Sequence, residues 1–181
     1  MAFLRTLAMT LAALLPPYAQ AEDIWVSNDA YLRGAIHDCT AAGPDRTVCR
    51  HFTGEALQKL FGIGDFCNES RCFKAVEIEW ELRDNPDKWG VLGAANDQAV
   101  LDKARELSAN GKAVIAVQSN DDRGQIGIIM PGAAVPSGKW GLNVPIAVAA
   151  RVDRPEASFY GKGINWLFSD PARVAIYVNL R

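Results

Sequence analysis

The stretch that decides the fold is Ala113-Val114-Ile115-Ala116-Val117, followed after a short interval by Gln125-Ile126-Gly127-Ile128-Ile129-Met130. The first run is compact and apolar, which is typical of a buried strand. Residues 120–124 between the runs are turn-forming, so the two strands are expected to form an antiparallel hairpin. Pro131 and Gly132 close the second strand.

Two further strands are expected after the hairpin, one near residues 144–150 and one over 174–180, where apolar side chains alternate with a period of two. The part of the chain before the hairpin has helical spacing instead. It predicts helices over about residues 29–38, 47–61 and 96–110, whereas residues 73–82 fit either a helix or a strand, with the helix favoured. N-terminal helices packed on a C-terminal antiparallel sheet make an α+β domain.

The first 21 residues have the pattern of a cleavable signal peptide. Arg5 precedes an apolar run over residues 7–15, and Ala19-Gln20-Ala21 is a small-x-small cleavage motif. The run is too short for a bilayer, which needs about 20 apolar residues, so no membrane span is expected after cleavage. We therefore expect a single domain over residues 22–181 in the periplasm or outside the cell.

Composition excludes several classes of function. The formal net charge is −2 and the charges are scattered, without the basic stripe that nucleic-acid binding requires. His37 and His51 are the two histidines, and no His or Cys pair has metal-ligand spacing. No phosphate-binding glycine loop or serine-nucleophile motif occurs either. We therefore expect neither a metal nor a cofactor.

The four cysteines, Cys39, Cys49, Cys67 and Cys72, suggest two disulfides in an oxidising compartment. Three pairings are possible, and proximity in the sequence favours Cys39 with Cys49 and Cys67 with Cys72. Cys49 also lies at the start of a predicted helix, where free amide N–H groups would stabilise a thiolate. The sequence leaves open whether Cys49 is a nucleophile or half of a crosslink.

A family resemblance bears on that choice. Cys49-Arg50-His51-Phe52, followed by Leu57, Leu60, Gly62-Ile63 and Asp65-Phe66, resembles the nucleophile helix of papain-like bacterial cell-wall amidohydrolases of the NlpC and CHAP types. The segment from Trp89 to Leu107 is similar to the middle of certain CHAP-like proteins, and the hairpin resembles the strand pair that carries the family's catalytic histidine. The resemblance covers residues 48–145 and implies a papain-like fold.

Carried over by position, the resemblance makes Cys49 the nucleophile and places Gln125 where the family has its histidine. An amide does not titrate near neutral pH, so Gln125 cannot take the proton of the thiol. Asn143 is the nearest polar candidate for the third, orienting residue. His51 is expected on the opposite side of the helix from Cys49, whereas His37 could reach the site from the preceding helix.

Three functions follow from these observations. The first is an exported amidohydrolase that cleaves amide bonds of cell-wall peptides through a Cys49 thioester. The second is a catalytically inactive relative that binds cell-wall peptide or a partner protein in the same cleft, near which Trp140 is expected. The third is an unrelated disulfide-stabilised binding or inhibitor domain. A Cys39–Cys49 disulfide would remove the nucleophile and exclude the first.

Overall fold

The computed structural model describes residues 23–43, 46–118 and 124–181. The predicted signal peptide and residues 120–123 of the predicted hairpin turn lie outside the described residues. Within the described ranges, no helix combines the length and the apolar character that crossing a membrane requires.

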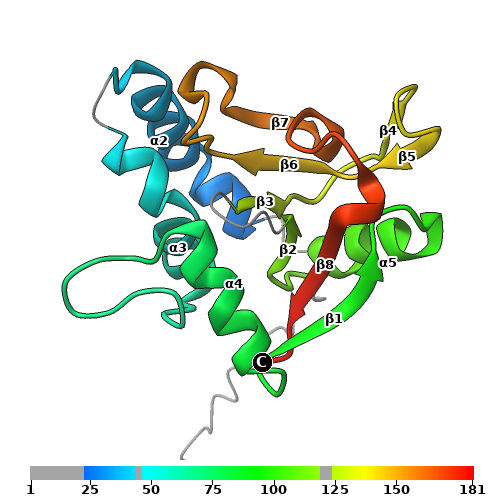
Figure 1. Cartoon of the computed structure of the whole chain (residues 1–181), viewed down its shortest axis with the longest axis horizontal. Helices are drawn as coiled ribbons and strands as arrows, with labels where there is room; N and C mark the ends of the chain where they lie inside the picture. The colour runs from blue at the N-terminus through cyan, green and yellow to red at the C-terminus, as the bar shows by residue number, and fades with distance from the viewer. Residues whose placement is uncertain (1–22, 44–45, 119–123) are drawn as a thin grey trace, which may run out of the picture.

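A six-stranded antiparallel sheet forms the centre of the domain (Figure 1). Its strand order is β1-β8-β2-β3-β6-β7. The strands are β1 (Trp89–Ala94), β2 (Val114–Gln118), β3 (Gln125–Ile129), β6 (Ile146–Ala149), β7 (Phe159–Gly163) and β8 (Val174–Asn179). A separate two-stranded sheet pairs β4 (Val135–Ser137) with β5 (Leu142–Val144), and short 3-10 helices occur at η1 (Pro155–Ala157), η2 (Ile164–Trp166) and η3 (Pro171–Arg173).

The expected pairing of β2 with β3 is confirmed, with Ile115 opposite Ile128 and Val117 opposite Ile126. All five residues of β2 are buried, because both faces of the sheet are covered. Ile115 and Val117 face one apolar cluster, and Val114 and Ala116 face another. A strand covered on both faces is apolar at every position rather than at alternate ones, which accounts for the compact run in the sequence.

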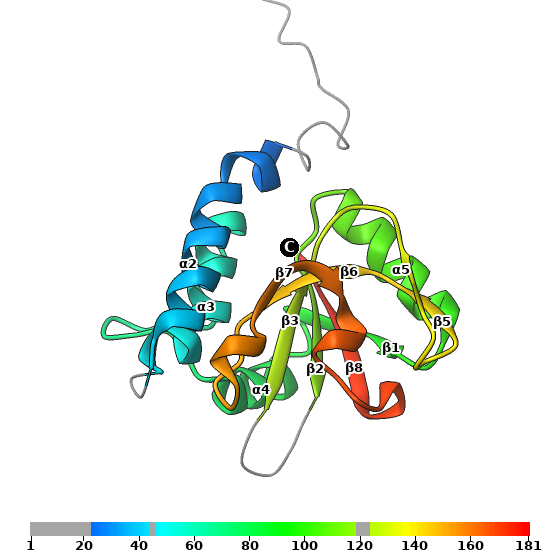
Figure 2. The same ribbon diagram turned by 90° about the horizontal axis from the view of Figure 1, so that it is seen from above.

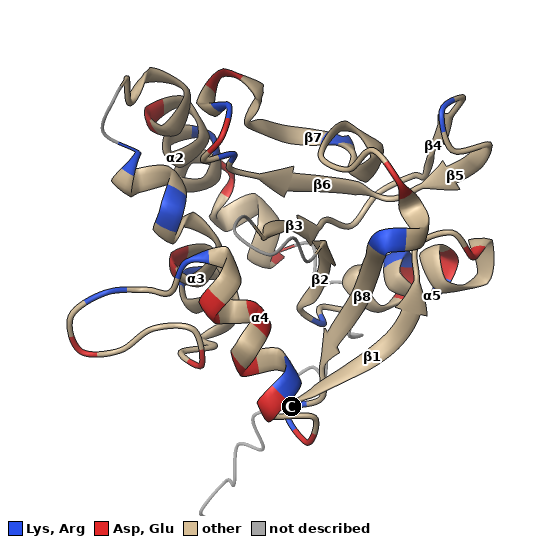
Figure 3. Cartoon of the chain, viewed as in Figure 1, with Lys and Arg blue, Asp and Glu red and all other residues tan. Residues whose placement is uncertain are grey.

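Three helices cover one face of the sheet, and one helix covers the other (Figure 2). The three are α2 (Asp29–Ala41), α3 (Thr47–Phe61) and α4 (Ala75–Asp84), and the single helix is α5 (Gln98–Ala109). The central strands β2, β3 and β6 carry no Lys, Arg, Asp or Glu, and these charged residues lie mostly on helices and loops (Figure 3).

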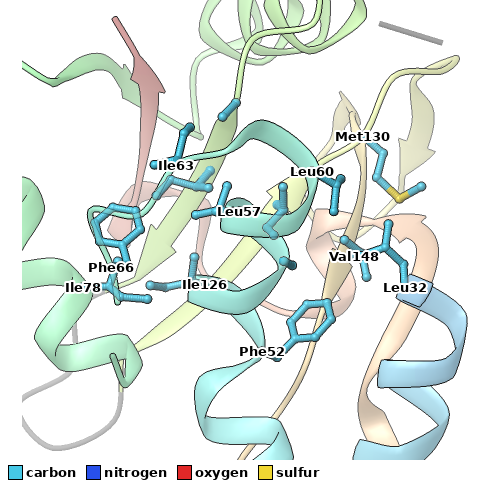
Figure 4. Packing of buried hydrophobic residues seen from close by; sticks show 14 of the residues in the cluster. Leu32, Phe52, Leu57, Leu60, Ile63, Phe66, Ile78, Ile126, Met130 and Val148 are labelled. Carbon is cyan, nitrogen blue, oxygen red and sulfur yellow. The ribbon is translucent and has the colours of Figure 1, made fainter. Parts of the chain in front are cut away.

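The apolar cluster between α2–α4 and the sheet is the larger of the two cores (Figure 4). Phe52 and Leu57 of α3 are almost fully buried against Ile126 of β3 and Val148 of β6. The helix ends at Gly62, whose φ of +67° is a left-handed conformation that suits glycine. These contacts fix the first turn of α3 beside the start of β3.

The α+β class is confirmed, but the order of elements differs from the expected one. Strand β1 lies between α4 and α5, so the helices do not all precede the sheet. Gly90 and Gly93 interrupt the strand pattern of β1, which is why the sequence did not reveal it. The ambiguous segment is a helix over Ala75–Asp84, with Ile78 and Leu82 buried one turn apart.

Candidate ligand-binding site

A pocket of about 490 Å³ lies where four segments meet: the start of α3, the start of α4, the start of β3 and the loop after β6. Both Cys49 and Gln125 line this pocket, so the structure brings the two predicted site residues to one place. We call it the β3-start pocket, and its lining is Arg46, Cys49, Arg50, Thr53, Lys74, Ala75, Val76, Gly124, Gln125, Ile126, Ala150, Arg151, Val152 and Asp153.

Cys49 is joined to Cys39 by a disulfide, and Cys67 is joined to Cys72. The pairing that sequence proximity favoured is therefore confirmed. The first bridge ties the last turn of α2 to the first turn of α3, and both of its cysteines are buried. With its sulfur in this bridge, Cys49 has no thiol and cannot act as a nucleophile.

A buried serine holds the disulfide against the loop after β6. The Ser158 hydroxyl accepts a hydrogen bond from the Arg151 backbone N–H at 2.8 Å. Its oxygen lies 3.1 Å from the Cys39 sulfur, so its own proton can be donated to that sulfur. The disulfide is thereby part of the wall of the pocket.

Gln125 is fixed by two hydrogen bonds that use both ends of its amide. In the amide orientation that satisfies both atoms, the nitrogen donates to the Leu167 carbonyl at 2.9 Å and the oxygen accepts from Arg151 Nη2 at 3.0 Å. The side chain thus joins β3 to the segment around Leu167 and to the loop after β6. An amide held in this way is a structural link, and it offers no proton acceptor of the strength of an imidazole.

Arg151 is the central polar group of the pocket, with only 6% of the residue exposed. Its guanidinium binds the Asp153 carboxylate through two hydrogen bonds, of 3.2 Å from Nε and 2.8 Å from Nη2. Burial acts to raise the pKa of Asp153, but the hydrogen bonds and charge of Arg151 outweigh it and hold that pKa below its usual value. Asp153 therefore remains a carboxylate at neutral pH.

Three more cations line the β3-start pocket. Arg46 Nη1 donates to the Val152 carbonyl at 2.7 Å, which closes the pocket between α3 and the loop after β6. Arg50 and Lys74 are exposed, at the starts of α3 and α4. With Arg151, four cationic side chains line the pocket against the one carboxylate of Asp153, so the described lining attracts anions.

The other predicted residues lie elsewhere. Asn143 is on β5, where its backbone exchanges two hydrogen bonds of 2.9 Å with the Gln98 side chain of α5. His37 is exposed beside Asp38, and His51 is half-buried on α3; neither lines the β3-start pocket. Trp140 packs at the edge of the apolar cluster under α5 and is likewise absent from the lining.

Sequence reasoning missed Arg151 and Asp153, which come from a loop whose position depends on the pairing of β6. Arg46 and Arg50 could have been noticed, since both lie within three residues of Cys49. Among the described residues, no three His, Cys, Asp or Glu side chains are grouped so that they could hold a metal ion.

In comparisons with known proteins, no protein-family model matches this chain, and no curated protein matches it significantly.

Proposed function

We propose that this chain is an exported, non-catalytic binding domain of papain-like architecture that holds a carboxylate-bearing peptide in the β3-start pocket. The observation that carries the proposal is the state of Cys49 and Gln125. A hydrolase of this kind would need a thiolate and a base at these positions. Here Cys49 is in a disulfide, and the Gln125 amide is held by two hydrogen bonds. The polar groups of the pocket instead support its wall, as Gln125 and Arg151 do, or supply positive charge, as Arg50 and Lys74 do.

The positive charge of the pocket favours a ligand that carries a carboxylate. Arg50 and Lys74 are exposed and available to a ligand, whereas Arg46 and Arg151 also support the pocket wall. Val76, Ile126 and Ala150 add an apolar part of the lining. Cell-wall peptides combine free carboxylates with small apolar side chains, and this is the combination that such a lining accepts.

Calorimetric titration with a synthetic cell-wall tetrapeptide, as the free acid and as the fully amidated form, tests the proposal. Each charge-assisted hydrogen bond contributes about 1.5–3 kcal/mol, so amidation is expected to weaken binding about tenfold or more. Arg50→Gln is expected to weaken binding of the free acid to a similar extent. Lys139→Gln, an exposed cation on the β4–β5 turn, is the matched control and should leave binding unchanged.

Equal binding of the acid and the amidated peptide would contradict the proposal, since the carboxylates would then not be what the pocket recognises. Loss of binding in Lys139→Gln as large as in Arg50→Gln would also contradict it, because the attraction would then belong to the whole surface. Raising the salt concentration should weaken binding of the free acid more than that of the amide.

Amide hydrolysis through Cys49 is the second candidate function. One observation favours it: Cys49 is the third residue of α3 and lies in a pocket lined by cations, the kind of surroundings in which reactive cysteines occur. Reduction, or the substitution Cys39→Ala, would free it. We expect Cys49 to be alkylated in that variant but no peptide to be cleaved, because Gln125 cannot act as the base. Mass spectrometry of the incubated peptide decides between the two functions, and a cleaved product would establish the hydrolase.

A further inference from the structure

The far end of strand β3 carries a second, separate groove, of about 680 Å³. It lies between the helical turn over residues 23–27, the start of α2, the end of α5, the loop over residues 130–133 and β7. We infer that this β3-end groove binds the C-terminal apolar residue of a peptide, with the carboxylate at Arg105. The inference uses none of the residues of the β3-start pocket and stands independently of the function proposed there.

Hydrogen bonds between elements fix two walls of the β3-end groove. The buried Ser108 hydroxyl of α5 donates to the Ile129 carbonyl at 2.9 Å, which holds the end of α5 against the end of β3. On the other side, the Tyr160 hydroxyl of β7 donates to Asp29 of α2 at 2.6 Å. Arg33 donates to the same carboxylate at 2.8 Å and lies 4.2 Å from the centre of the Tyr160 ring. The groove is therefore formed before any ligand arrives.

Two residues that line the groove have a buried N–H donor without an acceptor in the described ranges of the chain. Trp25 is 5% exposed, and its indole Nε1 has no hydrogen-bond partner among the described residues. Arg105 Nε is also buried without a partner, and no ion pair involves Arg105 in the part of the chain that the structure describes. Unsatisfied buried donors are rare in folded proteins. A cation and an N–H group lining one groove call for a ligand that supplies acceptors and negative charge, and a carboxylate supplies both.

The rest of the lining describes what the carboxylate is attached to. Val26 is 69% exposed, and with Met130 and Ala133 it gives the groove an apolar side. Asp29 also lines the groove, but its charge is already compensated by Arg33, so the groove has little attraction for a free ammonium group. Asp29 can still accept a neutral amide N–H. An apolar side chain, a carboxylate and an amide N–H together make the last residue of a peptide, rather than a free amino acid.

The indole N–H resonance of Trp25, assigned by comparison with Trp25→Phe, reports on binding directly. Acetyl-Ala-Ala-Leu as the free acid is the probe, and its C-terminal amide and free leucine are the comparison ligands. We expect the free acid to shift the Trp25 resonance and to bind about tenfold or more tightly than either comparison ligand. Arg105→Gln should abolish that preference for the acid, and Arg105→Lys should restore part of it, because a lysine keeps the charge without the guanidinium geometry.

Arg50→Gln, in the β3-start pocket, is the control and should leave the Trp25 shift unchanged. The inference is overturned if the amide shifts the Trp25 resonance as strongly as the acid, or if free leucine binds as tightly as the peptide. It is also overturned if no ligand shifts the resonance, since the groove would then bind neither the acid nor the comparison ligands. Circular dichroism of each variant confirms that a lost shift does not come from unfolding.

Discussion

The two ends of strand β3 differ in how their buried polar groups are hydrogen-bonded. At the Gln125 end, the buried polar groups bind one another: Gln125 contacts Arg151, and Arg151 binds Asp153 beside a disulfide. At the far end, the walls are held by hydrogen bonds, and the buried donors of Trp25 and Arg105 have no partner among the residues that the structure describes. Polar groups that hydrogen-bond to one another build a rigid wall. Such a wall can attract a ligand only through its net charge. Donors without partners instead favour a ligand that carries hydrogen-bond acceptors.

The largest expected effect comes from removing the crosslink of the Gln125 end. Cys39→Ala with Cys49→Ala removes a buried disulfide that closes a loop of about ten residues, and we expect a loss of about 3 kcal/mol in the free energy of unfolding. Urea denaturation of the oxidised proteins measures it. Hydrogen exchange should show faster opening at the start of α3 and unchanged protection around Ser108, at the other end of β3.

The second disulfide gives the matched control. Cys67→Ala with Cys72→Ala opens a shorter loop with an exposed tip, so a smaller loss of about 2 kcal/mol is expected. If this pair cost more than the Cys39–Cys49 pair, the crosslink behind the β3-start pocket would not be the more important one for stability.

Removing the amide that links three segments should have the next largest effect. Gln125→Leu deprives the Leu167 carbonyl and Arg151 of a partner, which we expect to cost about 1–3 kcal/mol and to weaken peptide binding in the β3-start pocket. Gln98→Leu is the control, since both ends of the Gln98 amide are hydrogen-bonded to the Asn143 backbone, but Gln98 lies on the other face of the sheet. Thermal unfolding and calorimetry measure the two effects. Unchanged binding in Gln125→Leu would show that the link does not shape the pocket.

At the far end of β3, Tyr160→Phe removes the hydroxyl that binds Asp29 and should cost about 1 kcal/mol. Burial, with the adjacent Asp29 carboxylate second, raises the pKa of Tyr160 to about 12. A raised pKa in the folded state means that this contribution is complete below pH 10 and declines as the pH rises toward 12. Urea denaturation of both proteins from pH 8 to 11.5 should show the difference shrinking above pH 10. A constant difference would contradict the hydrogen bond.

The smallest expected effect lies at the start of α4, beside the β3-start pocket. A salt bridge with Arg71, made by two hydrogen bonds of 2.8 and 2.6 Å, lowers the pKa of Glu77 to about 2. Because the folded-state pKa is depressed, the contribution is complete above pH 4.5 and is lost as the pH falls toward 2. The stability of Glu77→Gln should therefore approach that of the unaltered protein over this range. Acid titration followed by circular dichroism measures the convergence, and parallel curves would exclude the pair as a source of stability.

Local sequence signals predicted the elements whose boundaries are set locally. The spacing of Phe52, Ala56 and Leu60 and the stop at Gly62 gave α3 the same limits as the structure has. Strand β7 was missed because Gly161, Lys162 and Gly163 give it no alternation of apolar residues. Its place at the sheet edge depends on pairing with β6, which is a tertiary interaction.

Only those residues of the candidate site that nearby sequence marks were predictable. Cys49 was identified from its position at a helix start, and Gln125 from the resemblance that places it where the amidohydrolases have a histidine; both line one pocket. Asn143 was chosen as the nearest polar residue on a following strand, but β5 belongs to a different sheet, and the structure does not bring it to the pocket. Arg151 had no signal, because its role comes from burial and from contacts with Gln125 and Asp153 that only the folded chain creates.

We propose that the β3-start pocket binds carboxylates and does no chemistry. Incubation of the oxidised protein with the free-acid cell-wall tetrapeptide, followed by calorimetry and mass spectrometry of the same sample, tests both parts at once. We predict saturable binding that falls about tenfold or more in Arg50→Gln, with the peptide recovered intact. A cleaved peptide, or binding that Arg50→Gln leaves unchanged, would contradict the claim.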